Sequence, residues 1–145
     1  MNLKDTKTIR LLDYCTVERA KKNKLYDAGS ILLQVSASKG QLLYLKKTGV
    51  VESKYAVITV SEIDSEYLYY VMKHEMPKFL TQYQTGINIK PEVLKYFKLH
   101  IHNDKETQKH IAEVMRGIEK LESLEQMMIG KLQEKKKIDL REMFP

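Results

Sequence analysis

The sequence has little of what marks a secreted, membrane-spanning or catalytic protein. It holds one cysteine among 145 residues, which excludes an internal disulfide and fits a reducing compartment. No apolar run approaches the ~20 residues that a helix needs to cross a bilayer. The first ten residues are polar, and no apolar signal segment follows them. We therefore expect a cytoplasmic protein without a membrane partner.

Motifs for catalysis are also missing. The chain has no glycine-rich phosphate loop, nucleophile elbow, HExxH sequence or paired cysteines. Cys15 stands among apolar residues, where a cysteine is usually buried and inert. His100 and His102 would share one face of a strand, but no further ligand completes a metal site, and His74 and His110 are isolated. We predict a non-catalytic protein that holds no cofactor and no metal.

Positive charge is concentrated in the first part of the chain. The sequence carries 25 Lys and Arg against 19 Asp and Glu, a net charge of +6. Residues 1–104 hold 16 of the basic and 11 of the acidic residues, so the remainder is close to neutral. A net charge of this size permits nucleic-acid binding but does not require it.

Short β-rich segments dominate the first hundred residues. The apolar runs at 30–35, 41–45 and 55–60 predict three strands, and 97–101 alternates between polar and apolar like a last strand. Residues 1–10 are polar, and we expect them to be disordered. The pattern indicates a small, mostly antiparallel sheet.

Helical signals are short until the end of the chain. Asp64 or Ser65 is placed to cap a helix over 66–74, and Pro77 is expected to end it before a second short helix. Pro91 suits the start of one more helical turn.

The last third of the sequence carries the clearest helical signal. Apolar residues recur at intervals of three and four, the period of one helix face, and the opposite face is mostly Lys, Glu and Gln. Asn103 or Asp104 is placed to cap this helix. Gly117 and Gly130 each lower helix propensity by roughly 1 kcal/mol relative to alanine, so packing must stabilise the helix.

The apolar stripe is longer than a small sheet can cover. From Ile111 to Leu132 it runs about 30 Å at ~1.5 Å per residue, although an amphipathic helix often docks on its own domain. The stripe changes register near Leu124, which favours an antiparallel pair or small bundle over a parallel zipper. The expected pairing residues are Ile111, Val114, Ile118, Leu121, Leu124, Met128 and Leu132.

Together these patterns predict an α+β protein in two parts. Residues 1–103 would form a small mixed or antiparallel sheet domain with short helices. Residues 104–145 would form a long C-terminal helix for coiled-coil-type pairing.

Three polar loops have the composition of DNA-contacting segments. The loops at 36–40, 46–49 and 82–90 combine lysine with Ser, Thr, Asn and Gln, which supply donors to phosphates and base edges. Ordinary polar connections have the same composition, so this reading stays open. The expected DNA contacts are Ser36, Ser38, Lys39, Lys46, Lys47, Thr85 and Asn88.

Several segments of the chain occur in a recognisable order: Ala28–Gly40, Ile63–Met72, Thr85–Ile89, Val93–Phe97, Glu106–Ala112 and Leu132–Phe144. No single segment is diagnostic, but their order resembles that of one known family, the specificity subunits of type I restriction–modification systems. The chain is similar to half of such a subunit, with one target-recognition domain and one conserved spacer helix.

The resemblance implies a sequence-specific DNA-binding subunit without chemistry of its own. Relatives hold two recognition domains apart with two antiparallel helices, read a split DNA sequence, and recruit methyltransferase subunits, which bind S-adenosylmethionine. A restriction subunit joins some of these assemblies. A half-length chain would restore the arrangement as a homodimer on a palindromic split target. The alternative is a regulatory or orphan interaction protein that binds methyltransferase or full-length specificity subunits through its helix without reading DNA.

Overall fold

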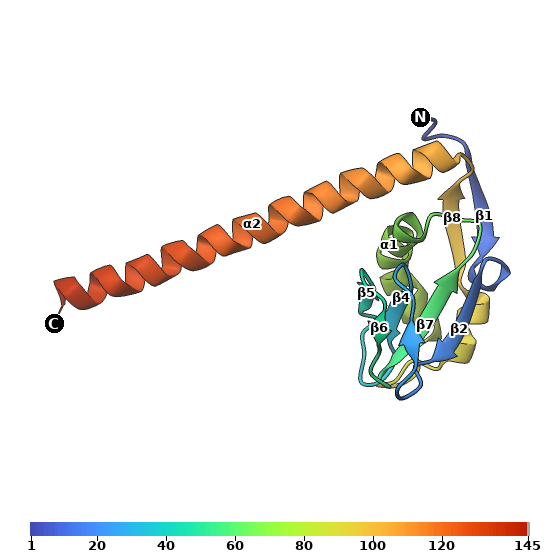
Figure 1. Cartoon of the computed structure of the whole chain (residues 1–145), viewed down its shortest axis with the longest axis horizontal. Helices are drawn as coiled ribbons and strands as arrows, with labels where there is room; N and C mark the ends of the chain where they lie inside the picture. Colours follow the sequence, from blue (N-terminus) through green and yellow to red (C-terminus); the bar gives the residue numbers. More distant parts are fainter. Residues whose placement is uncertain (145) are drawn as a thin grey trace. The chain divides into compact units, whose positions relative to one another are not determined.

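The computed structural model describes residues 1–144 (Figure 1). The chain forms two compact units, Met1–Ala112 and Glu113–Pro145. The first unit contains three small antiparallel sheets and the helix α1 (Ser65–Tyr83). The second consists of the greater part of a long helix, α2 (Lys105–Met143). The predicted α+β fold with a long C-terminal helix is confirmed.

A four-stranded antiparallel sheet is the centre of the first unit. Its strands are β2 (Cys15–Arg19), β4 (Ile31–Gln34), β5 (Leu42–Tyr44) and β7 (Tyr55–Val60). They lie in the order β2-β7-β4-β5, and the inner strands β7 and β4 carry most of the sheet's buried aliphatic side chains. The three strands expected over 30–35, 41–45 and 55–60 are confirmed.

Two strand pairs complete the β structure: β1 (Thr6–Arg10) with β8 (Lys98–His102), and β3 (Leu25–Tyr26) with β6 (Gly49–Val50). The expectation that residues 1–10 are disordered is wrong. Ile9 lies opposite Leu99 in the β1–β8 ladder, and both side chains are buried. The sequence missed β1 because its partner strand lies near the other end of the unit.

Helix α1 (Ser65–Tyr83) is longer than the sequence predicts. Its cap is Asp64, whose carboxylate accepts the Tyr67 N–H at 2.8 Å. The expected break at Pro77 is wrong, because the helix continues through it. A proline inside a helix costs about 3 kcal/mol. Met72, Met76 and the other buried side chains of this helix contribute roughly 1.5–3 kcal/mol each, which outweighs that cost.

Two short 3-10 helices join these elements, η1 (Leu11–Asp13) and η2 (Pro91–Tyr96). The helical turn predicted at Pro91 is therefore confirmed, with the proline in its first turn.

The start of α2 belongs to the first unit. Asp104 caps it: its carboxylate accepts the Thr107 N–H at 2.9 Å and the Thr107 hydroxyl at 2.6 Å. These hydrogen bonds, the one from the Thr107 side chain foremost, lower the pKa of Asp104. Gln108 is buried and donates to the His102 carbonyl at 2.7 Å. Within residues 1–144, neither α-helix combines the length and apolar character that a bilayer crossing requires.

Candidate nucleic-acid interface and pairing surface

The central sheet has two ends that differ in charge. Because its strands alternate in direction, β2 and β4 finish where β7 and β5 begin. One end of the sheet therefore brings together the loops 19–24, 35–41 and 51–54, and hydrogen bonds attach the segment 84–90 to them. We call these four segments the basic end. The other end of the sheet, which we call the opposite edge, brings together the loops 11–14, 27–30, 45–48 and 61–64.

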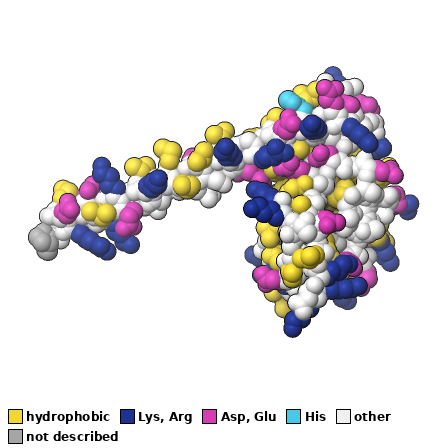
Figure 2. All heavy atoms as spheres, in the orientation of Figure 1, with side chains coloured by type: hydrophobic (Ala, Val, Ile, Leu, Met, Phe, Trp, Pro, Cys, Tyr) yellow, Lys and Arg dark blue, Asp and Glu magenta, His cyan; other side chains and the backbone are white. Residues whose placement is uncertain are grey.

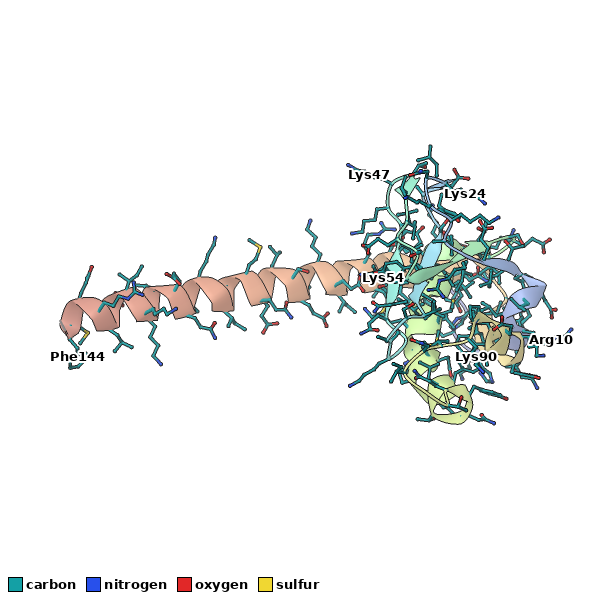
Figure 3. All side chains as sticks on the ribbon, turned by 90° about the horizontal axis from the view of Figure 1, so that it is seen from below. Arg10, Lys24, Lys47, Lys54, Lys90 and Phe144 are labelled. Carbon is teal, nitrogen blue, oxygen red and sulfur yellow. The ribbon has the colours of Figure 1, made fainter. Side chains whose placement is uncertain are left out.

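Seven basic residues and one acidic residue, Glu52, belong to the basic end. The loops at the opposite edge carry two lysines and four acidic residues. Figure 2 shows Lys and Arg side chains at the lower end of the sheet domain and also along its sides, and Figure 3 looks onto that lower end, where Lys24, Lys54 and Lys90 are labelled. The basic residues are Arg19, Lys21, Lys22, Lys24, Lys39, Lys54 and Lys90.

Ion pairs partly neutralise three of these lysines, and one of the pairs joins Lys54 to Glu52. Lys24 and Lys21 both form ion pairs with Glu18, the last acidic residue before the basic end. The hydrogen bond between Lys24 and Glu18 is the main cause that lowers the pKa of the carboxylate and raises the pKa of the ammonium. Both side chains are solvent-exposed, so the pair contributes little stability, and salt weakens it further.

Hydrogen bonds fasten the loops of the basic end to one another. Arg19 donates to the Ser36 hydroxyl at 2.8 Å and also to the Ser53 carbonyl. The Ala37 N–H donates to the Asn88 side chain at 2.8 Å, although 51 positions separate these residues. The segments at 35–41 and 84–90 thus form one surface, where the sequence suggested two separate loops.

Four of the seven predicted DNA contacts lie on this joint surface, which keeps them candidates: Ser36, Lys39, Thr85 and Asn88. Lys39, Thr85 and Asn88 are exposed, and Ser36 is half-buried. Ser38 differs, because its side chain is only 3% exposed. Its hydroxyl donates to Gln41 and accepts the Gly40 N–H, so it shapes the loop and is unsuited to base contact.

Lys46 and Lys47 lie elsewhere. The register of the β4–β5 hairpin, in which Ile31 faces Tyr44, places the turn after β5 beside Ser30 at the other edge of the sheet. Lys46 and Lys47 therefore lie at the opposite end of the β4–β5 hairpin from its turn at 35–41, apart from the other predicted contacts.

The sequence-based selection missed six basic residues of this end: Arg19, Lys21, Lys22, Lys24, Lys54 and Lys90. A signal was present in the basic run at 19–24. Without the strand order, however, nothing placed that run beside residues 35–41.

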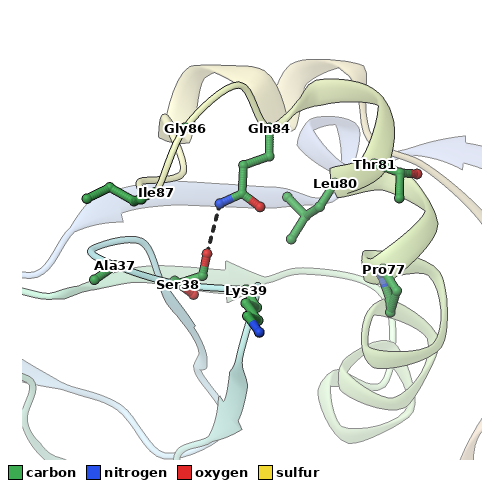
Figure 4. A pocket seen from close by; sticks show the side chains of 9 residues that line it. All are labelled: Ala37, Ser38, Lys39, Pro77, Leu80, Thr81, Gln84, Gly86 and Ile87. Atoms are coloured by element: carbon green, nitrogen blue, oxygen red, sulfur yellow. Dashed lines mark hydrogen bonds between the residues drawn. The ribbon is translucent and has the colours of Figure 1, made fainter.

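A cavity of about 690 Å³ lies beside the same loops (Figure 4). Pro77 and Leu80 of α1 form one wall, and Ala37 and Ile87 lie on the loop side. The Gln84 side chain bridges the two sides by donating to the Ser38 carbonyl at 2.8 Å.

The second unit offers an apolar surface. Of the seven predicted pairing residues, six belong to it and are exposed by 42% to 68%. The seventh, Ile111, is half-buried and belongs to the first unit. Further exposed apolar residues of α2 that the stripe omitted are Met127, Ile129, Ile138, Leu140 and Met143.

Charge along the second unit changes sign at its middle. Residues 113–127 carry four acidic and two basic side chains, whereas residues 128–144 carry three acidic and five basic ones. Antiparallel pairing of two such helices brings opposite charges together, and parallel pairing brings like charges together.

Cys15 and His102 have surroundings that are typical of residues with a structural role. Cys15 is buried, and burial raises the pKa of its thiol to about 12, which suppresses the reactive thiolate. The His102 ring shares a hydrogen bond of 2.8 Å with the Tyr67 hydroxyl. Among the described residues, no group of three or more His, Cys, Asp and Glu side chains is arranged to hold a metal ion.

The architecture is similar to that of solved type I specificity subunits. A chain from a study of complex assembly and conformational transition of the type I R-M system matches with a TM-score of 0.70 at 12% identity, covering 99% of this chain and 44% of its own. The type I S subunit from M. genitalium matches with a TM-score of 0.70 at 14% identity, covering 87% and 42%. The HsdS subunit from Thermoanaerobacter tengcongensis matches with a TM-score of 0.63 at 13% identity, covering 83% and 39%.

These likenesses define the fold, and the chain spans less than half the length of each of the three structures. The family model of the type I restriction modification DNA specificity domain matches residues 13–134, and the chain belongs to this family. No curated protein matches the chain.

Proposed function

We propose that this chain is a non-catalytic DNA-recognition half-subunit of a type I methyltransferase complex. It reads duplex DNA with its basic end and pairs through α2 with a second copy. The observation that carries the proposal is the charge difference between the two ends of the sheet, within a family of DNA specificity domains.

The basic end suits a duplex because phosphates dominate affinity and bases determine specificity. The cations of this surface come from Arg19, Lys21, Lys22 and Lys90. Ser36, Thr85 and Asn88 bring polar groups to the same surface, where they can reach base edges. The hydrogen bonds among these loops hold the contacts in place before DNA arrives, which lowers the entropic cost of binding.

The second unit suits pairing because its exposed apolar residues need a cover. A two-fold axis buries the same residues on both copies. The change of charge sign along the helix favours the antiparallel arrangement, which separates two DNA-reading domains and predicts a palindromic split target. A methyltransferase subunit would join this dimer and supply S-adenosylmethionine and catalysis, and a restriction subunit is a further candidate partner.

Light scattering of the purified chain tests pairing. The wild-type chain should have the mass of a dimer, and Leu121→Glu should yield monomers, because it places a charge in the apolar stripe. Ser123→Glu is the matched control, since it adds the same charge on the opposite helix face and should leave the dimer intact. A Leu121→Glu variant that remains dimeric would show that α2 is not the pairing element.

The salt dependence of DNA binding tests the basic end. Lys21→Ala with Lys22→Ala should reduce the slope of log affinity against log salt by up to about two. Lys46→Ala with Lys47→Ala removes the same charge at the opposite edge and should change the slope less. Equal changes would refute the assignment of the basic end. A chain that binds methyltransferase but no duplex at any salt would instead support the regulatory alternative.

A further inference from the structure

Ile87 is the most exposed large apolar side chain of residues 1–144, at 77%. It lies in the basic end between Gly86 and Asn88, and Ile89, two positions further on, is buried. Single exposed apolar residues are common on protein surfaces. The residues around Ile87, however, fix its backbone and place a hydrogen-bond donor and a lysine beside it.

The backbone on both sides of Ile87 is held in place. Its carbonyl accepts the Ser38 N–H at 2.9 Å, and the Ile89 N–H donates to the Val35 carbonyl at 2.8 Å. Ile87 therefore occupies a defined position on the surface. Ile87 is also among the residues that line the cavity whose other wall is formed by Pro77 and Leu80, and in Figure 4 its side chain points away from both of them.

The neighbouring Asn88 adds a hydrogen-bond donor. Its side-chain oxygen already accepts the Ala37 N–H, so its amide N–H groups are what it can offer a further partner. Lys39, which lines the same cavity, adds a cation suited to a phosphate.

An apolar side chain next to an amide donor matches one base edge. In the major groove thymine presents a C5-methyl group beside the O4 acceptor. We propose that Ile87 and Asn88 read a thymine, with Ile87 against the methyl group and the Asn88 amide donating to O4. This inference rests on the proposed function, since it requires the basic end to contact duplex DNA.

The test uses a duplex selected from a random library by the full chain together with a type I methyltransferase subunit. Each thymine of the selected duplex is replaced singly by deoxyuridine, which removes only the methyl group. For the wild-type chain, one thymine should show about fourfold weaker binding, the effect of one methyl group leaving an apolar contact. In Ile87→Ala the same replacement should have no further effect.

Leu43→Ala is the matched control, because it truncates another exposed aliphatic side chain, on β5, and should keep the full sensitivity to deoxyuridine. The inference is overturned if no thymine is sensitive, or if Ile87→Ala is as sensitive as the wild type. It is also overturned if Ile87→Ala weakens only methyltransferase binding. In these cases duplex binding, and with it the proposed function, still stands. If the chain binds no duplex at all, the proposed function itself fails.

Discussion

Gly40 closes the loop of the basic end against α1, and replacing it with alanine tests how that end is built. Its φ is +84°, a left-handed conformation that costs an alanine roughly 1–2 kcal/mol. A Cβ at this position would lie 2.4 Å from the Leu80 Cδ1 atom and 2.8 Å from the Met76 Cγ atom. Both neighbours are buried, so moving them costs about 1–3 kcal/mol more.

The free energy of unfolding of Gly40→Ala should therefore fall by about 2–5 kcal/mol. For a domain of this size the melting temperature should fall by at least about 8 °C. Thermal and urea unfolding, followed by the near-ultraviolet circular dichroism of the tyrosines, report on the sheet domain rather than on α2.

Gly86→Ala is the matched control within the same surface. No atom lies within 4 Å of the Cβ it would add, and Gly86 is not among the positive-φ residues. This variant should be slightly stabilised, by about 0.4–1 kcal/mol. If Gly40→Ala unfolds like the wild type or like Gly86→Ala, the close approach between the 35–41 loop and α1 is refuted.

Three further predictions concern Asp104, Cys15 and Gly117. Asp104→Ala should destabilise the chain at pH 7, because it removes the α2 cap. The pKa of Asp104 is lowered in the folded state, so the stability it contributes is present above its unfolded value near 3.8 and is lost as pH falls through the folded value. Urea unfolding of both proteins should show the difference at pH 7 and its loss in stronger acid, and a difference independent of pH would contradict the cap. Cys15 should react with a thiol reagent at pH 8 about a thousandfold more slowly in the folded chain than in urea, because burial raises its pKa from 9.0 to about 12. Comparable rates in the two states would mean that Cys15 is accessible. Gly117→Ala should raise the thermal stability of α2 by about 1 kcal/mol, because nothing lies within 4 Å of the added Cβ. Circular dichroism at 222 nm measures this, and a decrease would indicate that Gly117 packs against a partner.

Much of the first unit was predictable from local patterns. The strands β4, β5 and β7, the cap at Asp64 and the helical turn after Pro91 all depend on residues close together in the sequence. The periodicity of α2 is likewise a local signal. The order of the family motifs gave the same answer as the fold.

The errors share one physical cause, which is that they depend on contacts between distant segments. The β1–β8 ladder joins Thr6 to His102, and no signal within residues 1–10 predicts a partner so far away. Pro77 breaks an isolated helix, but the buried side chains on both sides of it hold α1 together.

The candidate nucleic-acid interface was likewise predictable only in part. Composition alone identified loops with lysine and small polar residues, since side-chain chemistry is a property of each residue. Strand order and register decided which loops share a surface: they joined Ser36 and Asn88, buried Ser38 and placed Lys46 at the other edge. Local patterns encode the family motifs, the strands β4, β5 and β7 and the amphipathic helix, because periodicity and turns depend on neighbouring residues. The position of the positive charge depends on which strand ends meet, and this follows from the folded arrangement of the chain alone.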